Sequence, residues 1–375
     1  MEGELSIIGN KYQIGKRIGG GSFGQIFEVI DTESQKHYAA KLEHISHKSP
    51  QVINEAKLLK SLGSLEGIPR VRWYGVQSRF NVMVMELLGK SLEELFNSCR
   101  RRFSIKTCLM LALQFLELIE AIHKKDVIHR DIKPENYVMG INKKTHLVYM
   151  IDFGLSKRFR DRVTTLHIPF KENRNLVGTA RYASINNHIG VEQSRRDDLE
   201  SIGYVLIYFA KGNLPWQGNN PTNKHQKYHK IMETKLRTSV GELCRGLPQE
   251  FQNYINYCRN LSFNSNPDYE YLKGLFKTVA AKFQIGMDKI YDWSEDPKPK
   301  SKKLESRKVK RTKKKKSTLE VPETNKKSSS VVNTCNLGKW PEFKDVTKIR
   351  LELEKLKTRD KLEVTPDEKP SCTLF

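Results

Sequence analysis

The hydrophobic pattern of the chain changes at Gly89, and this change limits the fold more than any other feature of the sequence. Before Gly89, short segments rich in β-branched and aromatic residues alternate with turn residues, which predicts strands. The expected strands cover residues 12–18, 25–30, 37–42, 70–76 and 80–88. One helix interrupts them at 51–62, because its apolar residues recur every three or four positions.

After Gly89 the apolar residues follow a helical period. Segment 107–123 is apolar over a wide face and predicts a long, mostly buried helix, and 198–210 has the same character. The expected fold class is therefore α+β, with a small strand-rich lobe over about 12–88 and a larger helical lobe over about 89–293. Ligands usually bind where two such units meet, so a site is expected in the cleft between them.

Beyond Trp293 the periodic pattern ends. The 375-residue chain carries 66 Lys and Arg against 43 Asp and Glu, a formal net charge of +23, and 12 of these bases with a single acid occupy 298–316. A segment with so much charge and so few apolar residues cannot form a core, so 294–375 is predicted to be a basic, largely disordered tail. Apolar spacing predicts one short helix in it, at 344–361, too short for a coiled coil.

The tail suggests partners without choosing among them. Its basic run fits a nuclear-localisation signal, a nucleic-acid contact or a patch for anionic membrane, and solvated charge without a partner is the alternative. The last four residues, 372–375, fit a geranylgeranylation signal with Cys372 as the acceptor. Against this, Thr373 is not aliphatic, and so short a match also arises by chance.

The remaining sequence features indicate a soluble, intracellular protein. None of the six cysteines forms a CxxC pair or a zinc-type cluster, so free thiols in a reducing compartment are expected. The first ten residues lack the basic and apolar regions of a secretory signal, and the longest strongly apolar run, 202–210, is far shorter than a membrane span. We expect a cytoplasmic monomer, with a nuclear or membrane-associated pool if the tail acts as an address.

A glycine-rich segment, GGGSFG at 19–24, joins the first two predicted strands. Glycines let a backbone approach phosphates and point N–H groups at them, although such turns are common and the pattern alone is weak. A dinucleotide-binding turn would continue into a helix, whereas 25–29 continues as a strand, which favours the phosphate-covering loop of protein kinases. The expected nucleotide contacts are Ile18, Gly19, Gly20, Gly21, Ser22, Phe23, Gly24 and Ile26.

A lysine, Lys41, ends the third predicted strand. Such a lysine is often a strand-end charge that faces water, but at this distance after the glycine-rich loop it can reach the α- and β-phosphates of a nucleotide. It would need an anionic partner to hold it. Glu55 on the following helix is the candidate, although most glutamates on helices are only solvated.

Residues 129–136 read HRDIKPEN, and this is the most specific motif of the chain. Asp131 would accept or orient the proton of an attacking hydroxyl, Asn136 would hold a Mg²⁺ ion, and Lys133 would steady the transferred phosphoryl group. A Lys two positions after the Asp is the usual serine/threonine-kinase signature. The alternative, a surface loop of mixed charge, does not explain this order of residues.

The sequence Asp152-Phe153-Gly154 follows a predicted strand at 147–151. Asp152 would chelate the Mg²⁺ that bridges the β- and γ-phosphates of ATP. Phosphoryl transfer needs positioning and charge neutralisation more than covalent chemistry, and Lys41, Asp131 and Asp152 with their neighbours supply both. We therefore expect ATP and Mg²⁺ as substrate and cofactor.

Residues 178–186 read GTARYASIN, with Ser-Ile-Asn where a generic kinase carries Ala-Pro-Glu. This departure is characteristic of the casein kinase 1 family, and the chain resembles that family from about 12 to 293. Further matching segments are 83–89 (MVMELLG), 167–169 (HIP), 192–200 (EQSRRDDLE), 214–218 (LPWQG) and 267–269 (PDY).

The resemblance implies a two-lobed protein kinase that binds ATP in its cleft, with Met85 as the gatekeeper and with Glu86 and Leu88 in the adenine-binding hinge. It also implies a preference for acidic or already phosphorylated protein substrates. The positions that match the family's anion-binding bases are Arg174, Arg181 and Lys227. The alternative is that these three are ordinary exposed bases.

Two other classes of function compete with an active kinase. A pseudokinase scaffold would be expected to lack Lys41, Asp131 or Asp152, and all three are present. A nucleic-acid or membrane-binding module could reside in the tail, but such a tail would address the kinase rather than replace it.

Overall fold

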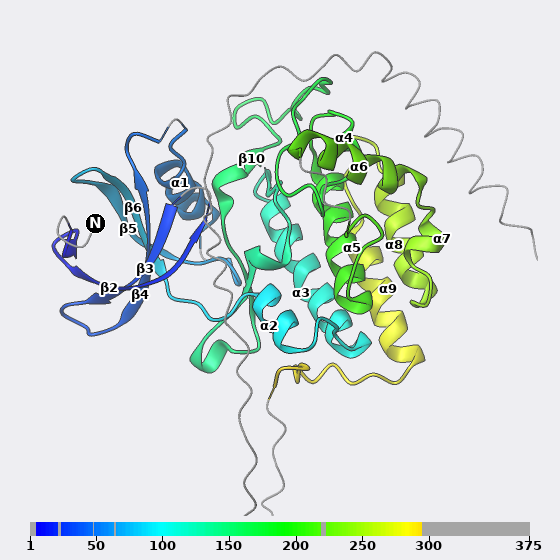
Figure 1. Cartoon of the computed structure of the whole chain (residues 1–375), viewed down its shortest axis with the longest axis horizontal. Helices are drawn as coiled ribbons and strands as arrows, with labels where there is room; N and C mark the ends of the chain where they lie inside the picture. Colours follow the sequence, from blue (N-terminus) through cyan, green and yellow to red (C-terminus); the bar gives the residue numbers. More distant parts are fainter. Residues whose placement is uncertain (1–4, 22–23, 48, 64, 219–222, 295–375) are drawn as a thin grey trace, which may run out of the picture.

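The computed structural model describes residues 5–21, 24–47, 49–63, 65–218 and 223–294, and it contains two lobes of different architecture (Figure 1). One lobe is a twisted antiparallel sheet with helix α1 (Val52–Leu62) beside it, and the larger lobe is built mainly of helices. The predicted α+β fold class is therefore confirmed. The predicted tail, its helix at 344–361 and Cys372 lie outside the described residues, apart from residue 294.

The sheet of the smaller lobe has six strands in the order β1-β2-β3-β4-β6-β5. Their bounds are β1 (Ile7–Ile8), β2 (Tyr12–Gly21), β3 (Gly24–Asp31), β4 (His37–His44), β5 (Val71–Gln77) and β6 (Phe80–Glu86). The strand expected at 80–88 ends two residues early, because the chain leaves the sheet there for the connector to the other lobe. Strand β1 was not predicted, since two residues carry no readable period.

The alternation of side chains along β4 determines which way its lysine points. Ala39 packs in the main core together with α1, whereas Ala40 and Leu42 belong to a separate cluster on the other face of the sheet. Successive side chains of a strand point to opposite faces, so Lys41 lies on the same side as Ala39 and faces α1.

The glycine at the start of β3 is required by close packing against β4. The backbone of Gly24 has φ +150°, and a Cβ atom there would lie 2.4 Å from the carbonyl oxygen of Leu42. Only glycine lets the two strands approach this closely at the base of the glycine-rich segment.

The larger lobe contains helices from both halves of the chain. They are α2 (Leu92–Ser98), α3 (Ile105–His123), α4 (Ile185–His188), α5 (Arg195–Lys211), α6 (Lys224–Arg237), α7 (Val240–Leu243), α8 (Gln249–Asn260) and α9 (Tyr269–Lys282). The helices predicted at 107–123 and 198–210 both begin earlier than expected. In α3 the reason is an N-cap, because the Ser104 hydroxyl accepts a hydrogen bond from the Thr107 amide.

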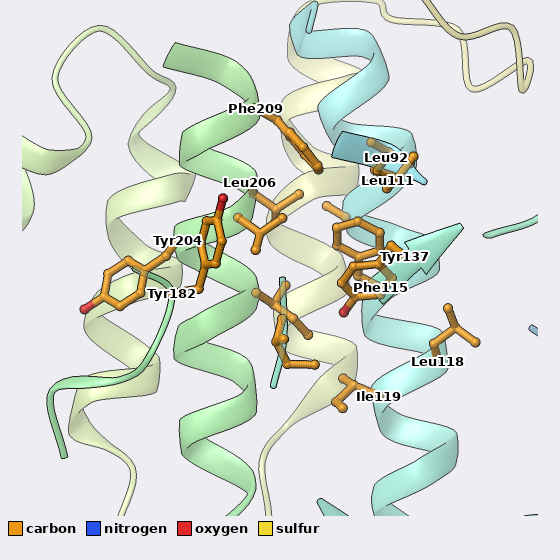
Figure 2. Packing of buried hydrophobic residues seen from close by; sticks show 14 of the residues in the cluster. Leu92, Leu111, Phe115, Leu118, Ile119, Tyr137, Tyr182, Tyr204, Leu206 and Phe209 are labelled. Carbon is orange, nitrogen blue, oxygen red and sulfur yellow. The ribbon is translucent and has the colours of Figure 1, made fainter. Parts of the chain in front are cut away.

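Helix α3 lies in the centre of this lobe and packs against α5 and α9 (Figures 1 and 2). Phe115 on α3 stacks on Tyr137, with ring centroids 3.8 Å apart, and both side chains are fully buried. Burying a large apolar side chain stabilises a fold by about 1.5–3 kcal/mol, so α3 contributes much of the stability of the lobe. Among the described residues, no helix combines the length and the apolar character that crossing a membrane requires.

Short strands bring the functional loops to the face of the helical lobe that meets the sheet. They are β7 (Val127–Ile128), β8 (Tyr137–Met139), β9 (Val148–Met150) and β10 (Lys157–Arg158), paired as β7 with β10 and β8 with β9. The HRDIKPEN segment follows β7, and the Asp152-Phe153-Gly154 turn follows β9. The HRDIKPEN segment also leads directly into β8, which pairs with β9, so the two motifs are joined through one pair of strands.

Candidate active site

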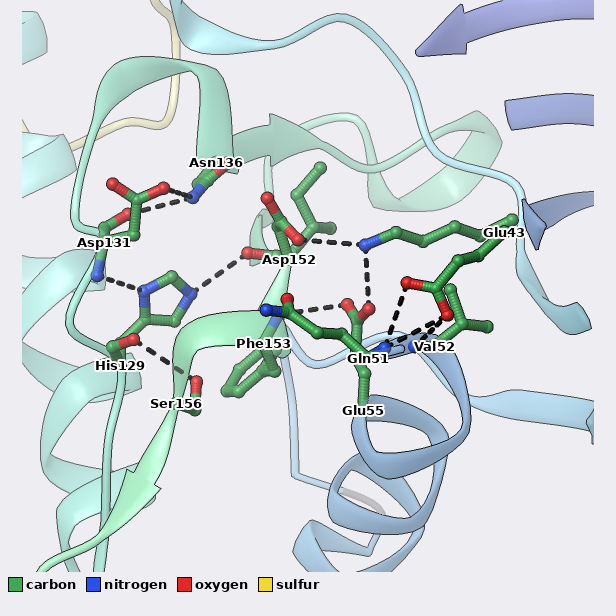
Figure 3. A network of polar contacts seen from close by, with 12 residues as sticks. Glu43, Gln51, Val52, Glu55, His129, Asp131, Asn136, Asp152, Phe153 and Ser156 are labelled. Atoms are coloured by element: carbon green, nitrogen blue, oxygen red, sulfur yellow. Dashed lines mark hydrogen bonds and ion pairs between the residues drawn. The ribbon is translucent and has the colours of Figure 1, made fainter. Parts of the chain in front are cut away.

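Lys41 connects the two lobes through two ion pairs. Its Nζ atom lies 2.7 Å from Oε2 of Glu55 on α1 and 2.9 Å from Oδ1 of Asp152 (Figure 3). Burial acts against the charged lysine, but the carboxylates of Glu55 and Asp152 outweigh it and raise the pKa of Lys41 above its usual 10.5. The structure thus brings together the three residues that the sequence placed in one site.

Lys41 and Asp152 both keep their charges over the physiological pH range. Burial would raise the pKa of Asp152, but the charge of Lys41 outweighs it and holds that pKa below its ordinary 3.8. A raised lysine pKa preserves the contribution of the pair until pH exceeds 10.5, and a lowered aspartate pKa preserves it until pH falls below 3.8. Titration of Lys41 or Asp152 should therefore not shape activity between pH 5 and 9.

Helix α1 also holds the turn that carries Asp152. The carboxylate of Glu55 accepts a hydrogen bond of 3.0 Å from the Phe153 amide through the oxygen that is not paired with Lys41. The side chain of Gln51 extends toward the same turn (Figure 3). Its Oε1 atom is buried without a hydrogen-bond partner, and it would lie 2.6 Å from a Cβ atom at Gly154. Sequence reasoning did not identify Gln51.

Asp131 is held on both carboxylate oxygens. Oδ1 accepts hydrogen bonds from the backbone amide (2.9 Å) and the hydroxyl (2.8 Å) of Thr179, and Oδ2 lies 2.6 Å from Nζ of Lys133. Gly178 makes this approach possible, because a Cβ atom there would lie 2.3 Å from the Arg130 carbonyl oxygen and its φ is +88°. The segment after residue 178 is therefore fixed against the HRDIKPEN segment, residues 129–136, which is called the catalytic loop below.

A buried aspartate on α5 holds the backbone at the start of the catalytic loop. Asp198 accepts hydrogen bonds from Nε2 of His123 (2.9 Å) and from the amides of His129 (2.8 Å) and Arg130 (2.9 Å). Burial would raise the pKa of Asp198, but these hydrogen bonds outweigh it and hold the pKa below its usual range. They also hold Arg130 at φ +68°, a left-handed conformation that a residue with a side chain rarely adopts.

Asp198 lay inside a predicted helix, but no role was assigned to it. An acidic residue within an otherwise apolar helical pattern is a sequence signal for such a buried carboxylate. His129 provides a second link, because its Nε2 atom lies 3.1 Å from the carbonyl oxygen of Ile151, just before Asp152 (Figure 3). The two motif-bearing loops therefore support each other.

The oxygen atoms at the site fit a magnesium ion with nucleotide phosphates. The amide nitrogen of Asn136 donates to the carbonyl oxygen of Asp131 at 2.9 Å, which leaves Oδ1 of Asn136 as the atom available to a cation. Within the described segments, no group of three or more His, Cys, Asp or Glu side chains could hold a metal alone. Mg²⁺ commonly binds through one or two protein oxygens plus phosphate oxygens, so Asp152 and Asn136 are a suitable pair.

The expected nucleotide-binding residues lie on the sheet and on the connector. Gly19, Gly20 and Gly21 end β2, Gly24 begins β3, and Ile18 and Ile26 lie on the same two strands. Met85 is buried near the end of β6, Glu86 is its last residue, and Leu88 lies in the connector. Ser22 and Phe23 fall outside the described residues.

The three candidate anion-binding bases lie in different surroundings. Arg174 pairs with Glu192 (3.3 Å), which Lys157 also contacts (3.1 Å), whereas Arg181 lies over the ring of Tyr182. Lys227 is exposed on α6. Cationic side chains carry only donors and do not hydrogen-bond to one another, so the grouping of these three bases into one anion-binding site stays a prediction.

The chain was compared with models of protein families. The model described as "Protein kinase domain" matches residues 12–271 of this chain. The matched region contains strands β2 to β6 of the sheet, the connector, both motif-bearing loops and the helical lobe as far as the start of α9.

Proposed function

The chain belongs to the protein kinase family, and we propose that it is an active serine/threonine kinase of the casein kinase 1 type that phosphorylates acidic or already phosphorylated proteins. As in the family generally, ATP is the substrate and Mg²⁺ the usual cofactor. The observation that carries the proposal of activity is the complete set of contacts around Lys41 and Asp131.

Each of the site residues has a separate role in phosphate transfer. Lys41, held by Glu55, presents a fixed positive charge to the phosphates of ATP. Asp131 orients the substrate hydroxyl and accepts its proton, and Lys133 lies close enough to stabilise negative charge on the transferred phosphoryl group. Asp152 and Asn136 would hold Mg²⁺, which would supply further neutralisation of the phosphate charge.

Specificity for Ser and Thr is supported by Lys133, the position that distinguishes the serine/threonine signature in the sequence. The casein kinase 1 type is supported by Ser184-Ile185-Asn186 in place of Ala-Pro-Glu. Ser184 begins α4 as its N-cap, and its hydroxyl donates a hydrogen bond of 2.6 Å to Asp197. This anchor gives the serine of the motif a structural role that the alanine of the generic motif could not fill, because alanine has no hydroxyl.

Recognition of an acidic or phosphorylated substrate is supported by the position of Arg181. This residue follows Thr179 by two positions, and Thr179 contacts Asp131 directly. The guanidinium of Arg181 interacts electrostatically with Glu135 of the HRDIKPEN segment, and its carbonyl oxygen is held by the indole N–H of Trp216 at 2.7 Å. A positive charge placed here can attract an anionic side chain close to the target hydroxyl.

Two matched peptides test the substrate preference. One carries phosphoserine three residues before the target Ser, the other carries Ala there, and the wild type and Arg181→Ala are assayed with both. We expect kcat/KM to be at least about tenfold higher for the phosphorylated peptide in the wild type, and this preference to be lost in Arg181→Ala, because a charge-assisted hydrogen bond contributes about 1.5–3 kcal/mol. Equal use of both peptides by the wild type would reject the anion-binding assignment and leave the kinase activity standing.

The proposal also covers where in the cell the tail directs the enzyme. A basic run at 298–316 with Cys372 near the end of the chain would suit attachment to an anionic membrane, since a single lipid needs a second signal for stable anchoring. The same run would suit a nuclear signal or nucleic acid, and a cytoplasmic monomer is expected if the tail binds nothing.

A further inference from the structure

Helix α6 buries a lysine completely against the segment that precedes α4. The side chain of Lys235 is 0 % exposed, and its Nζ atom donates hydrogen bonds to the carbonyl oxygens of Ala180 (2.9 Å) and Ala183. It also lies 3.2 Å from Nε2 of His188. Neither the motifs nor the mechanism described above uses this residue.

Aromatic rings enclose the same amine. The Nζ atom of Lys235 lies 4.9 Å from the ring centroid of Tyr204 on α5 and 5.0 Å from that of Trp216. Burial lowers the pKa of Lys235 well below its usual 10.5, and Glu200 only partly opposes this. Both protonation states keep at least two N–H protons, so the amine can donate to both carbonyl oxygens whether or not it is charged.

The contacts of Lys235 form part of a series that fixes one short segment of backbone. Trp216 donates its indole N–H to the carbonyl oxygen of Arg181, and Nε2 of His188 lies 3.0 Å from that of Ala180. The carbonyl oxygens of residues 180, 181 and 183 are thus all bound by side chains. This segment directly follows Thr179, whose amide and hydroxyl bind Asp131.

Burying an amine costs free energy of desolvation, whereas an apolar side chain of similar length would fill the same core position without needing hydrogen-bond partners. Here the partners are carbonyl oxygens of the segment 179–183. This segment carries Arg181, which is proposed to bind substrate, and Thr179, which contacts Asp131. The arrangement therefore points to a role in placing that segment.

We propose that Lys235 is a positioning residue for substrate binding: its hydrogen bonds to Ala180 and Ala183 place Arg181 and Thr179 relative to Asp131 and so set the affinity for the protein substrate. This inference rests on the proposed function, because it concerns how that same site holds its acceptor. It adds a determinant on α6, outside the motifs that carry the catalytic residues.

The test compares Lys235→Met with Lys230→Met in the full-length protein. Lys230 lies on the same helix and is exposed, so it serves as a matched control. For Lys235→Met we expect the KM for the acceptor peptide to rise about tenfold, as the loss of a hydrogen bond of this kind predicts, while the KM for ATP stays at the wild-type value. Lys230→Met should match the wild type in both constants. A purely structural role would lower the amount of active enzyme without raising the KM for the peptide.

A second variant covers the case in which Lys235→Met does not fold. Trp216→Phe keeps an aromatic ring near Lys235 but removes the N–H that donates to the Arg181 carbonyl oxygen, so it should raise the peptide KM in the same direction. If Lys235→Met folds and has the wild-type KM for the peptide, this inference is wrong although the kinase proposal stands. If Lys235→Met does not fold, a wild-type peptide KM in Trp216→Phe leads to the same conclusion. If the wild type phosphorylates no peptide at all, the proposed function itself fails.

Discussion

Replacement of Asp131 by Asn is expected to lower kcat for phosphate transfer by about 10³-fold, within the range that a general base contributes, and to leave the KM for ATP nearly unchanged. Asparagine has the same shape and can still accept the hydrogen bonds from Thr179. It cannot take up the proton of the substrate hydroxyl, and it does not attract the Lys133 ammonium as a carboxylate does. The kinetic constants can be measured with ATP and a serine-containing acceptor peptide.

Asp126→Asn is the matched control for this experiment. Asp126 lies five positions earlier in the chain, pairs with Arg160 at 3.5 Å near the surface, and also has a positive φ that Asn tolerates. This control should retain wild-type kinetics. An Asp131→Asn enzyme that kept more than a tenth of the wild-type kcat would show that Asp131 is not the residue that handles the proton.

Replacement of Lys41 by Met is expected to affect both stability and activity. The lysine is 7 % exposed and separates two carboxylates, so its removal leaves Glu55 buried without a cation close to Asp152. Breaking a buried pair in this way costs about 3–5 kcal/mol, which thermal unfolding or denaturant titration would detect. Phosphate transfer should fall by about 10²-fold or more, because a fixed charge on the ATP phosphates is lost.

The double variant Lys41→Met/Glu55→Gln separates these two effects. It removes the buried charge that lacks a partner, so more than half of the lost stability should return, whereas activity should remain low because no cation reaches the phosphates. Lys16→Met, which disrupts a surface pair with Glu28, serves as the exposed control and should change neither property. Recovery of activity together with stability in the double variant would mean that Lys41 acts only through folding.

The sequence predicted the parts of this molecule that follow local rules. The strands 12–18, 25–30 and 37–42 correspond to β2, β3 and β4, because a period of two is visible within a few residues. The proximity of Lys41, Glu55 and Asp152 followed from motifs whose chemistry requires them to meet, and the structure places both carboxylates within hydrogen-bond distance of Lys41.

The parts that were missed depend on tertiary packing. Helices α6 to α9 are more polar than α3, so their period was not read. They are held by packing against other helices: α8 against α5, α9 against α3, α6 against α4 and α7 against α8. The buried polar groups Gln51 and Lys235 gave no signal, because nothing in a linear pattern states whether a polar side chain will find a partner inside the fold.

The central claim is that the site around Lys41 and Asp131 transfers the γ-phosphate of ATP to serine or threonine. The most direct measurement is to incubate the full-length protein with γ-labelled ATP, Mg²⁺ and a protein acceptor rich in acidic residues, and then to identify the phosphorylated amino acids. We predict labelled phosphoserine and phosphothreonine with the wild type and none above background with Asp131→Asn. Labelled phosphotyrosine alone would contradict the specificity, and the absence of any label with folded, ATP-binding wild type would contradict the account as a whole.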